Sequence, residues 1–253
     1  MNKKINLMSH LVAGFPTDEI AFEAAKALVD AGAEVLEIQL PFSDPSADGV
    51  AIQSACTRVL RRNYTTKNGL AFVEKIHKAF PNVKIFIMSY GSLIFTPGVE
   101  NFCKMACSVG VNGLIVPDFP FDCDEGLTSC CKKYGMLNIP VAAPSMKDER
   151  LEKLLNANFE YIYVALRAGI TGSETLISEE TIDFLKKVSA KGAKIYGGFG
   201  LNKGEQAKKI APFVHGVVAG SVFVRLIEKN KNDKTALYNA IKTKAEEFIN
   251  ANL

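Results

Sequence analysis

A glutamate stands inside an apolar segment near the start of the chain. Residues 34–40 read EVLEIQL, the composition of a short buried strand, with Glu37 at the centre. Because strand side chains alternate between two faces, Val35, Glu37 and Gln39 share one face. The other face is wholly apolar and consists of Leu36, Ile38 and Leu40. We expect that apolar face to meet helices, which leaves Glu37 pointing into the interior of the fold.

Glu37 could therefore act as a general acid and base. A poorly solvated carboxyl group disfavours its ionised form, and it can give and take a proton near neutral pH. A second carboxylate, Asp48, follows in the loop PFSDPSADG, at the same end of the predicted strand. The structural alternatives are a hydrogen-bonded glutamate in the core, and turn or helix-cap chemistry for Asp44 and Asp48.

Two glycine-rich turns late in the chain suggest a phosphate site. The segment GGFG (197–200) follows one predicted strand, and Gly220 with Ser221 follows the next, in AGSVFV. Glycines let backbone N–H groups approach an anion closely, and the N-terminus of a helix adds a favourable dipole. Either turn alone would be ordinary turn chemistry, but the pair predicts a phosphate pocket.

A long loop, LRAGITGSETLIS (166–178), lies between a predicted strand and a helix that should begin near Glu179. It is rich in glycine, threonine and serine and is longer than most loops between a strand and a helix. The pattern is typical of a lid that closes over a substrate, and the alternative is an ordinary surface loop.

The elements that must position these residues alternate along the whole chain. Apolar strand candidates lie at 7–13, 34–40, 83–88, 112–116, 138–142, 159–165, 193–197 and 214–219. Helical patterns lie between them; one begins after Thr17 and ends before Gly32, and another ends before Gly110. Eight such units without a linker predict a single-domain (β/α)8 barrel, a TIM barrel, over residues 1–253. Periodicity alone leaves a doubly wound open sheet as the alternative.

The composition excludes several classes of protein. The 253 residues are 48% hydrophobic and 23% charged, which suits a globular domain, and 30 basic residues balance 27 acidic ones. The charges are interspersed, so the chain lacks the basic patch that nucleic acids require. The sequence has no cleavable leader and no stretch of membrane-spanning length, so we expect a cytoplasmic protein with no membrane contact.

The cysteines and histidines do not form a metal motif. The six cysteines include no CxxC pair, which favours reduced, mostly buried thiols over a zinc or redox site. His10, His77 and His215 are far apart in the sequence, and we expect structural or surface roles for them. Of the three, His10 is the one to inspect, because it lies in a predicted strand.

Taken together, these segments resemble the alpha subunit of tryptophan synthase. The resemblance rests on LPFSDPSADG, RAGITG, GGFG and AGS in that order, with GLIVPDFP (113–120) and AGFP (13–16), and it spans essentially the whole chain. It implies a (β/α)8 barrel that cleaves indole-3-glycerol phosphate to indole and glyceraldehyde 3-phosphate. It also implies an α2β2 complex, in which a pyridoxal-phosphate-dependent beta subunit receives indole, and no cofactor or metal in this chain.

The resemblance also implies roles for particular residues. Glu37 matches the general acid-base that protonates the indole ring at C3, and Asp48 matches the carboxylate that holds the indole N–H. Tyr163 matches a tyrosine lining the indole pocket. The remaining matches are the phosphate contacts and a lid threonine: Gly172, Gly200, Gly220 and Ser221, with Gly198 nearby, and Thr171.

The sequence departs from the family pattern in several places. About six residues precede the first strand, so the family's N-terminal helix is shortened or absent. Gln39 replaces a glycine, Val50 a proline, and Leu166 a serine before the lid. The segment SYGSLIF (89–95), with Gly91 and Ser92, stands where the family more often has a Tyr-Asn-Pro segment that contacts the beta subunit.

Other functions fit the sequence less well. Indole-glycerol phosphate synthase, phosphoribosyl anthranilate isomerase and thiamin phosphate synthase share such a phosphate pocket, but they lack the PFSDPxADG loop. A Schiff-base aldolase needs a lysine at the catalytic end of a strand, whereas Lys84 and Lys194 lie at strand starts. A metal aldolase needs a histidine cluster. A non-catalytic binding subunit that activates a partner stays as the alternative from another class.

Overall fold

The computed structural model describes residues 3–166 and 177–252. The strands are β1 Asn6–Val12, β2 Val35–Gln39, β3 Lys84–Met88, β4 Gly113–Ile115, β5 Leu137–Asn138, β6 Val141–Ala142, β7 Tyr161–Ala165, β8 Lys194–Gly198 and β9 Gly216–Ala219. The helices are α1 Asp18–Ala31, α2 Val50–Leu60, α3 Thr66–Ala79, α4 Gly91–Phe95, α5 Val99–Ser108, α6 Leu127–Lys133, α7 Asp148–Asn156, α8 Glu179–Ser189, α9 Gly204–Ile210, η1 Ala211–Phe213 (a 3₁₀ helix), α10 Ser221–Asn230 and α11 Lys234–Ile249.

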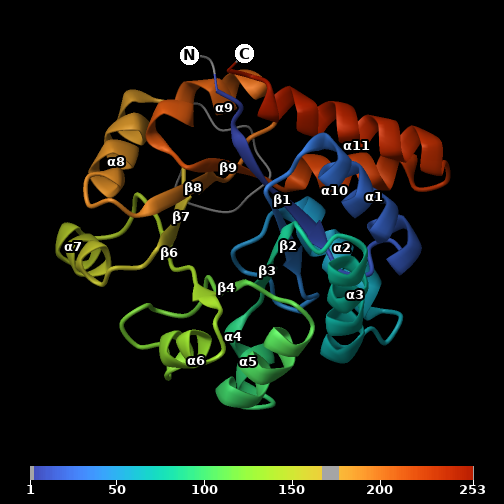
Figure 1. Ribbon diagram of the computed structural model, residues 1–253, viewed down its shortest axis with the longest axis horizontal. Coiled ribbons are helices and arrows are strands. Elements are labelled where there is room, and N and C mark those ends of the chain that lie inside the picture. The colour runs from blue at the N-terminus through green and yellow to red at the C-terminus, as the bar shows by residue number, and fades with distance from the viewer. Residues whose placement is uncertain (1–2, 167–176, 253) are drawn as a thin grey trace.

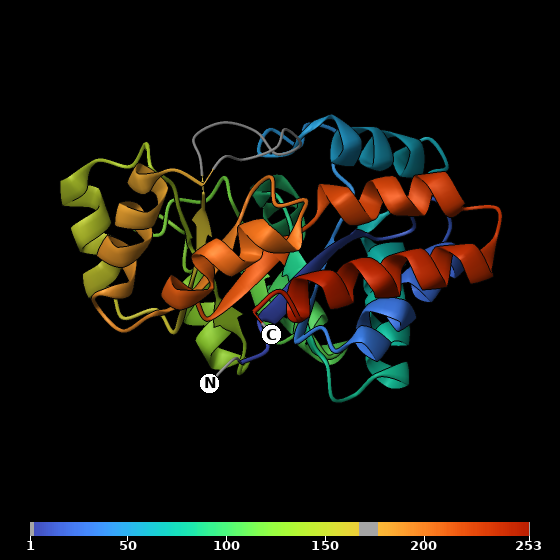
Figure 2. The same ribbon diagram turned by 90° about the horizontal axis from the view of Figure 1, so that it is seen from above.

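All the strand pairings are parallel, and the sheet order is β5-β4-β3-β2-β1-β9-β8-β7-β6. The two ends of this order, β5 and β6, are consecutive in sequence, so the sheet curls back on itself. Figure 1 shows the helices arranged around the strands, and Figure 2 shows the same arrangement turned by 90°. This is the barrel architecture that the sequence predicts, with the alternative of an open, doubly wound sheet excluded.

The predicted strand 138–142 is wrong in one respect, because it forms two short pieces, β5 and β6. Pro140 lies between them and has no N–H to donate, which interrupts the strand. The backbone still bridges its neighbours: Ile139 N donates to Leu114 O at 2.9 Å, and Tyr163 N donates to Pro140 O at 2.9 Å. This segment therefore forms a thin seam that closes the barrel.

The first helix forms where its capping residues predict it. Thr17 is the N-cap of α1, and its hydroxyl accepts a hydrogen bond from Ile20 N at 3.3 Å. Gly32 ends the helix with φ 95°, a left-handed conformation that favours glycine. The expected end of α5 before Gly110 and the expected start of α8 near Glu179 also agree with the structure.

The side chains of the strands divide between two hydrophobic clusters, as the alternation predicts. Leu36, Ile38 and Leu40 belong to the outer cluster, between the sheet and the helices. Val35 points into the barrel with Met8 and the aromatic rings of the inner cluster. The inner cluster comprises Met8, Val35, Phe86, Met88, Tyr90, Ile115, Ile139, Tyr161, Tyr163, Tyr196 and Val218. Glu37 therefore lies on the inner face of β2.

The segment before β1 and the end of α11 lie side by side near the amino ends of the strands. Ile5 N donates to Ile249 O at 2.9 Å, which ties the segment before β1 to the end of α11. Residues 3–5 form no helix, and β1 begins at Asn6. Among the described residues, no helix has both the length and the apolar composition to cross a bilayer.

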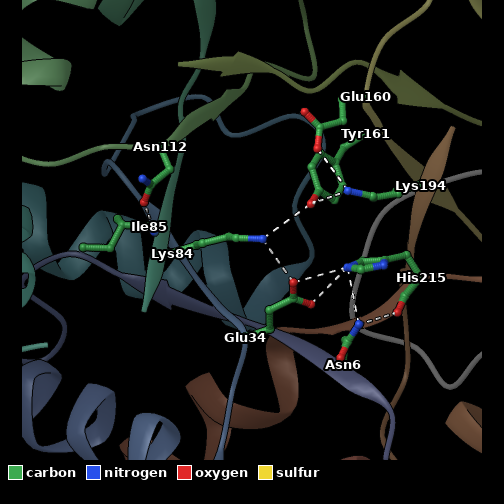
Figure 3. A network of polar contacts seen from close by, with 9 residues as sticks. All are labelled: Asn6, Glu34, Lys84, Ile85, Asn112, Glu160, Tyr161, Lys194 and His215. Carbon is green, nitrogen blue, oxygen red and sulfur yellow. Dashed lines mark hydrogen bonds and ion pairs between the residues drawn. The ribbon is translucent and has the colours of Figure 1, made fainter. Parts of the chain in front are cut away.

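A polar network fills the amino end of the barrel (Figure 3). Glu34 is its centre: its carboxylate lies 3.2 Å from Lys84 Nζ and 3.1 Å from His215 Nε2. Asn6 Nδ2 donates to the backbone oxygen of His215 at 2.9 Å, and Lys84 Nζ also reaches Tyr161 Oη at 3.4 Å. Lysine and histidine donors at the starts of several strands thus converge on one carboxylate.

The surroundings of Glu34 favour its ionised form. Burial alone would raise the pKa of this carboxyl, but the hydrogen bonds and charges of His215 and Lys84 outweigh burial and lower it from 4.5 to about 2. The depressed pKa means that Glu34 contributes stability above about pH 4.5. That contribution is lost as the pH falls from about 4.5 toward 2.

We expect Glu34→Gln to destabilise the protein at pH 7 by about 1 kcal/mol after allowance for partial exposure, or about 2–4 °C in Tm. The loss in Tm should shrink as the pH falls toward 3, because the wild-type protein then loses the same contribution. Thermal unfolding followed by circular dichroism at pH 7, 5 and 3 measures this. Glu160→Gln, which breaks the exposed pair with Lys194, is the matched control and should change Tm little. An equal loss at every pH would contradict the role given to Glu34.

Candidate active site

A cavity opens at the carboxyl ends of the strands, opposite the polar network. Its lining comes from β1, β2, β3, β4, β6, β7 and β9, from the loops that follow several of these strands and β8, and from the starts of α2 and α10. The lining residues are His10, Glu37, Ala47, Asp48, Ile52, Met88, Ile115, Pro117, Val141, Tyr163, Phe199, Gly200, Leu201, Val218, Gly220 and Ser221. Carboxylates, aromatic rings and glycine turns therefore meet at one site, where barrels of this kind carry their chemistry.

Glu37 is paired with His10 inside the barrel. The parallel register of β1 and β2 places these two residues opposite each other, and each side chain is only 5% exposed. His10 Nδ1 lies 3.0 Å from Glu37 Oε1. Burial alone would lower the pKa of His10, but the carboxylate of Glu37, and more weakly that of Asp48, raises it above 6.5. The contact with Glu37 thus favours the protonated form of the imidazole.

Asp48 is held by two side chains that the sequence analysis did not assign to it. Gln39 Nε2 and Tyr90 Oη each donate to Asp48 Oδ2 at 2.8 Å. Tyr90 also accepts a hydrogen bond from Ala47 N at 3.1 Å, which ties the loop to the end of β3. Burial raises the pKa of Asp48, while His10 and these two hydrogen bonds partly oppose that shift. The loop thus fixes a carboxylate whose hydrogen bonds favour its ionised form.

The wall between the carboxylates and the glycine turns is apolar and aromatic. Tyr163 and Phe199 form an edge-to-face pair with ring centroids 6.0 Å apart. Gly198 makes room for this pair, because a Cβ atom there would lie 2.9 Å from Tyr163 Oη and 2.6 Å from the Cβ of Val218. A flat aromatic ligand fits such a wall.

Residues of the two glycine turns also line the cavity. Gly200 has φ 78°, and Phe199 has φ 90°, a strained conformation for a residue with a side chain. Gly220 is the N-cap of α10, and the buried Ser221 is the first residue of that helix. The first turn of α10 carries no acidic side chain. These features suit a bound phosphate.

The structure brings together most of the residues that the sequence analysis singles out. Glu37, Asp48, Tyr163, Gly200, Gly220 and Ser221 line the cavity, and Gly198 lies beneath Tyr163. Thr171 and Gly172 lie outside the described residues. In the described part of the chain, no group of three or more His, Cys, Asp or Glu residues is arranged to hold a metal ion.

Sequence reasoning missed the partners of the two carboxylates. It placed His10 in a strand without giving it a role at the site, and it noted Gln39 only as a replacement for glycine. Strand alternation could have put Gln39 beside Glu37 on the inner face. The contact between His10 and Glu37 depends on the register of β1 against β2, which no local pattern specifies.

Comparisons with known proteins agree with this geometry. The family model described as tryptophan synthase alpha chain matches residues 1–252. The tryptophan synthase alpha chain of Helicobacter hepaticus is 36% identical over 232 residues, which cover 89% of this chain and 87% of that protein. The corresponding chain of Methanocaldococcus jannaschii is 37% identical over 224 residues and covers 88% of this chain and 79% of that protein.

Solved structures give the same result. A structure from Aquifex aeolicus superposes with a TM-score of 0.87 at 29% identity, covering 99% of this chain and 94% of that one. A chain of the tryptophan synthase complex of Pyrococcus furiosus superposes with a TM-score of 0.85 at 29% identity, covering 98% of this chain and 99% of that one. The chain belongs to the tryptophan synthase alpha chain family.

Proposed function

We propose that this protein cleaves indole-3-glycerol phosphate to indole and glyceraldehyde 3-phosphate by a retro-aldol reaction. One observation carries the proposal: two buried carboxylates, Glu37 and Asp48, share a cavity with an aromatic wall and two glycine turns. Together these features match a substrate in which a glycerol chain joins an aromatic ring to a phosphate. Membership of the family supports the same reaction.

The residues divide the chemistry between them. Glu37 protonates C3 of the indole ring, which makes the bond between C3 and the glycerol chain breakable. Asp48, fixed by Gln39 and Tyr90, accepts the indole N–H and stabilises the positive charge that develops on the ring. Tyr163 lies against the ring, and the turns at Gly200 and Gly220 hold the phosphate with Ser221. The resemblance implies that Thr171 belongs to the lid and that Gly172 contacts the phosphate, and both roles stay predictions.

The protein acts with a tryptophan synthase beta subunit in an α2β2 complex. Pyridoxal phosphate belongs to that partner, and this chain's own reaction requires acid-base groups only. A cytoplasmic location stays a prediction from the sequence. The similarity to a chain of the tryptophan synthase complex of Pyrococcus furiosus supports this partner.

The beta subunit would dock on the apolar surface beside the cavity mouth. Phe95, on α4 after β3, is 47% exposed, and its ring lies 4.7 Å from that of Phe119 after β4. Val50, at the start of α2, is 75% exposed. Exposed large apolar side chains on a folded chain favour a protein partner. Phe95 ends the segment 89–95 that the family resemblance associates with the beta subunit.

We expect Glu37→Gln to lower kcat for indole release by about 10²–10⁴-fold, because the variant has no acid to protonate the ring. Asp48→Asn should lower kcat by a comparable factor, since a neutral amide cannot balance the charge on the ring. Indole formation by the purified chain, with and without a cognate beta subunit, measures both variants. Binding of a phosphate-bearing substrate analogue should be retained. Unchanged turnover of either variant would remove that residue from the mechanism.

Gly220→Glu should raise KM more than tenfold, because its carboxylate repels phosphate and its Cβ would lie 3.0 Å from the Cβ of His10. Lys229→Gln changes the net charge equally, at the far end of the same helix, and is the control. Calorimetric titration with glycerol 3-phosphate separates binding from turnover. Equal affinity of wild type and Gly220→Glu would disprove the phosphate assignment.

Phe95→Ser should weaken the activation of indole release by the beta subunit and leave the activity of the isolated chain near that of wild type. The change removes an apolar contact from the proposed docking surface but does not touch the cavity lining. Titration of activity against beta-subunit concentration measures the effect. Tyr238→Ser, an aromatic replacement on α11, is the control. Identical titration curves for Phe95→Ser and wild type would exclude Phe95 from the interface.

A further inference from the structure

The retro-aldol reaction needs a group that accepts the proton of the substrate hydroxyl, in addition to the acid that protonates the ring. We propose that His10 is this second catalytic residue, and that it works with Glu37 as a pair that donates one proton and accepts another. The inference rests on the proposed reaction and adds a base to it.

The first observation is the arrangement of the pair. His10 Nδ1 and Glu37 Oε1 lie 3.0 Å apart, so one nitrogen and one oxygen are used by the contact between them. The other two atoms, His10 Nε2 and Glu37 Oε2, are buried and have no hydrogen-bond partner among the described residues. A buried polar atom without a partner is costly, and both side chains line the cavity. The pair therefore offers a ligand two polar atoms.

The second observation is the position of the imidazole within the site. A Cβ atom built at Gly220 would lie 3.0 Å from His10 Cβ and 3.6 Å from His10 Cδ2. His10 thus lies between Glu37, which meets the ring, and Gly220, at the phosphate turn. A substrate whose ring meets Glu37 and whose phosphate meets the turn at Gly220 therefore places its glycerol chain, with the hydroxyl group next to the ring, beside His10.

The atoms and electrons balance in one turnover. Glu37 gives its proton from Oε2 to C3 of the ring, and the ring takes a positive charge. The hydroxyl proton moves to His10 Nε2, the oxygen electron pair forms the carbonyl group, and the bond to C3 breaks. The electron pair of that bond returns to the ring and restores neutral indole. As the products leave and solvent enters the cavity, the proton on His10 Nε2 passes through solvent to Oε2 of Glu37, while Nδ1 keeps its own proton, so the pair returns to its starting state.

The state of the pair that reacts contains one proton shared between Glu37 and His10. The other groups that face it are Asp48 and Tyr163, with Gln39 nearby on β2. Asp48 favours a charged imidazole, and burial raises the pKa of Tyr163, so that the phenol stays neutral at neutral pH. The reaction should slow at low pH, where the pair holds two protons, and at high pH, where it holds none.

The test compares wild type with His10→Asn. The asparagine amide can occupy the place of Nδ1 beside Glu37, but it has no atom at Nε2 and cannot accept a proton. We expect kcat to fall by about 10²–10³-fold with KM changed less than threefold. The loss of activity at low pH should also disappear, because the variant has no imidazole that can take up a second proton. His77→Gln, a histidine replacement on α3 outside the cavity, is the control.

Binding of indole-3-propanol phosphate, which has no hydroxyl group next to the ring, provides the readout that does not depend on turnover. His10→Asn should bind this analogue as wild type does, which shows that the site is folded. If the variant fails to fold, His10→Gln replaces it, with the same kinetic expectation.

Two results would overturn the inference: near-normal kcat in the variant, or a rise in KM alone. In either case, Glu37→Gln tells whether the proposed function survives. An inactive Glu37→Gln beside an active His10→Asn keeps the reaction and removes His10 from it. A wild-type chain that releases no indole even with its beta subunit would instead refute the proposed function itself.

Discussion

A hydrogen bond of 3.0 Å joins Glu37 to His10 in the interior of the barrel, and the site is organised around the cost of burying such groups. A carboxylate removed from water is tolerated when charges or hydrogen bonds replace its solvation. Glu37 receives a histidine from the neighbouring strand, and Asp48 receives an amide and a phenol. Each partner comes from β1, β2 or β3 or from the residues just after them. The parallel register that builds the barrel therefore also supplies the hydrogen bonds that replace water around its carboxylates.

The two ends of the barrel use charged groups for different purposes. At the amino end, His215 and Lys84 donate hydrogen bonds to Glu34 and lower its pKa, so this network stabilises the fold. At the carboxyl end, Glu37 and His10 keep one polar atom each without a partner among the described residues. A satisfied network holds strands together, whereas an unsatisfied pair is available to a ligand. The network that stabilises the fold and the pair that we propose for the reaction thus lie at opposite ends of the barrel.

The sequence predicted the barrel and most of the site because both depend on local patterns. Alternation along residues 34–40 identified the inner and outer faces of β2, and the glycine turns marked the part of the cavity where we propose that phosphate binds. The break at Pro140 was missed because the apolar residues around it read as one strand. His10 and Tyr90 were missed because their contacts depend on register and on how a loop folds over β3, and these are tertiary properties. Gln39 was visible on the correct face, but its partner lay nine residues away in a loop.

The seam at Ile139 and Pro140 has a consequence for how the barrel moves. Two residue pairs join β4 to β5, two join β6 to β7 and two join β8 to β9, whereas five join β1 to β2 and five join β2 to β3. Local opening begins where the fewest backbone hydrogen bonds must break. In a closed ring with this strand order, the seam lies across the barrel from β1. Together with the β8–β9 pairing, the seam is therefore where backbone amide hydrogens should exchange early, while β1 and β2, which carry His10 and Glu37, stay paired.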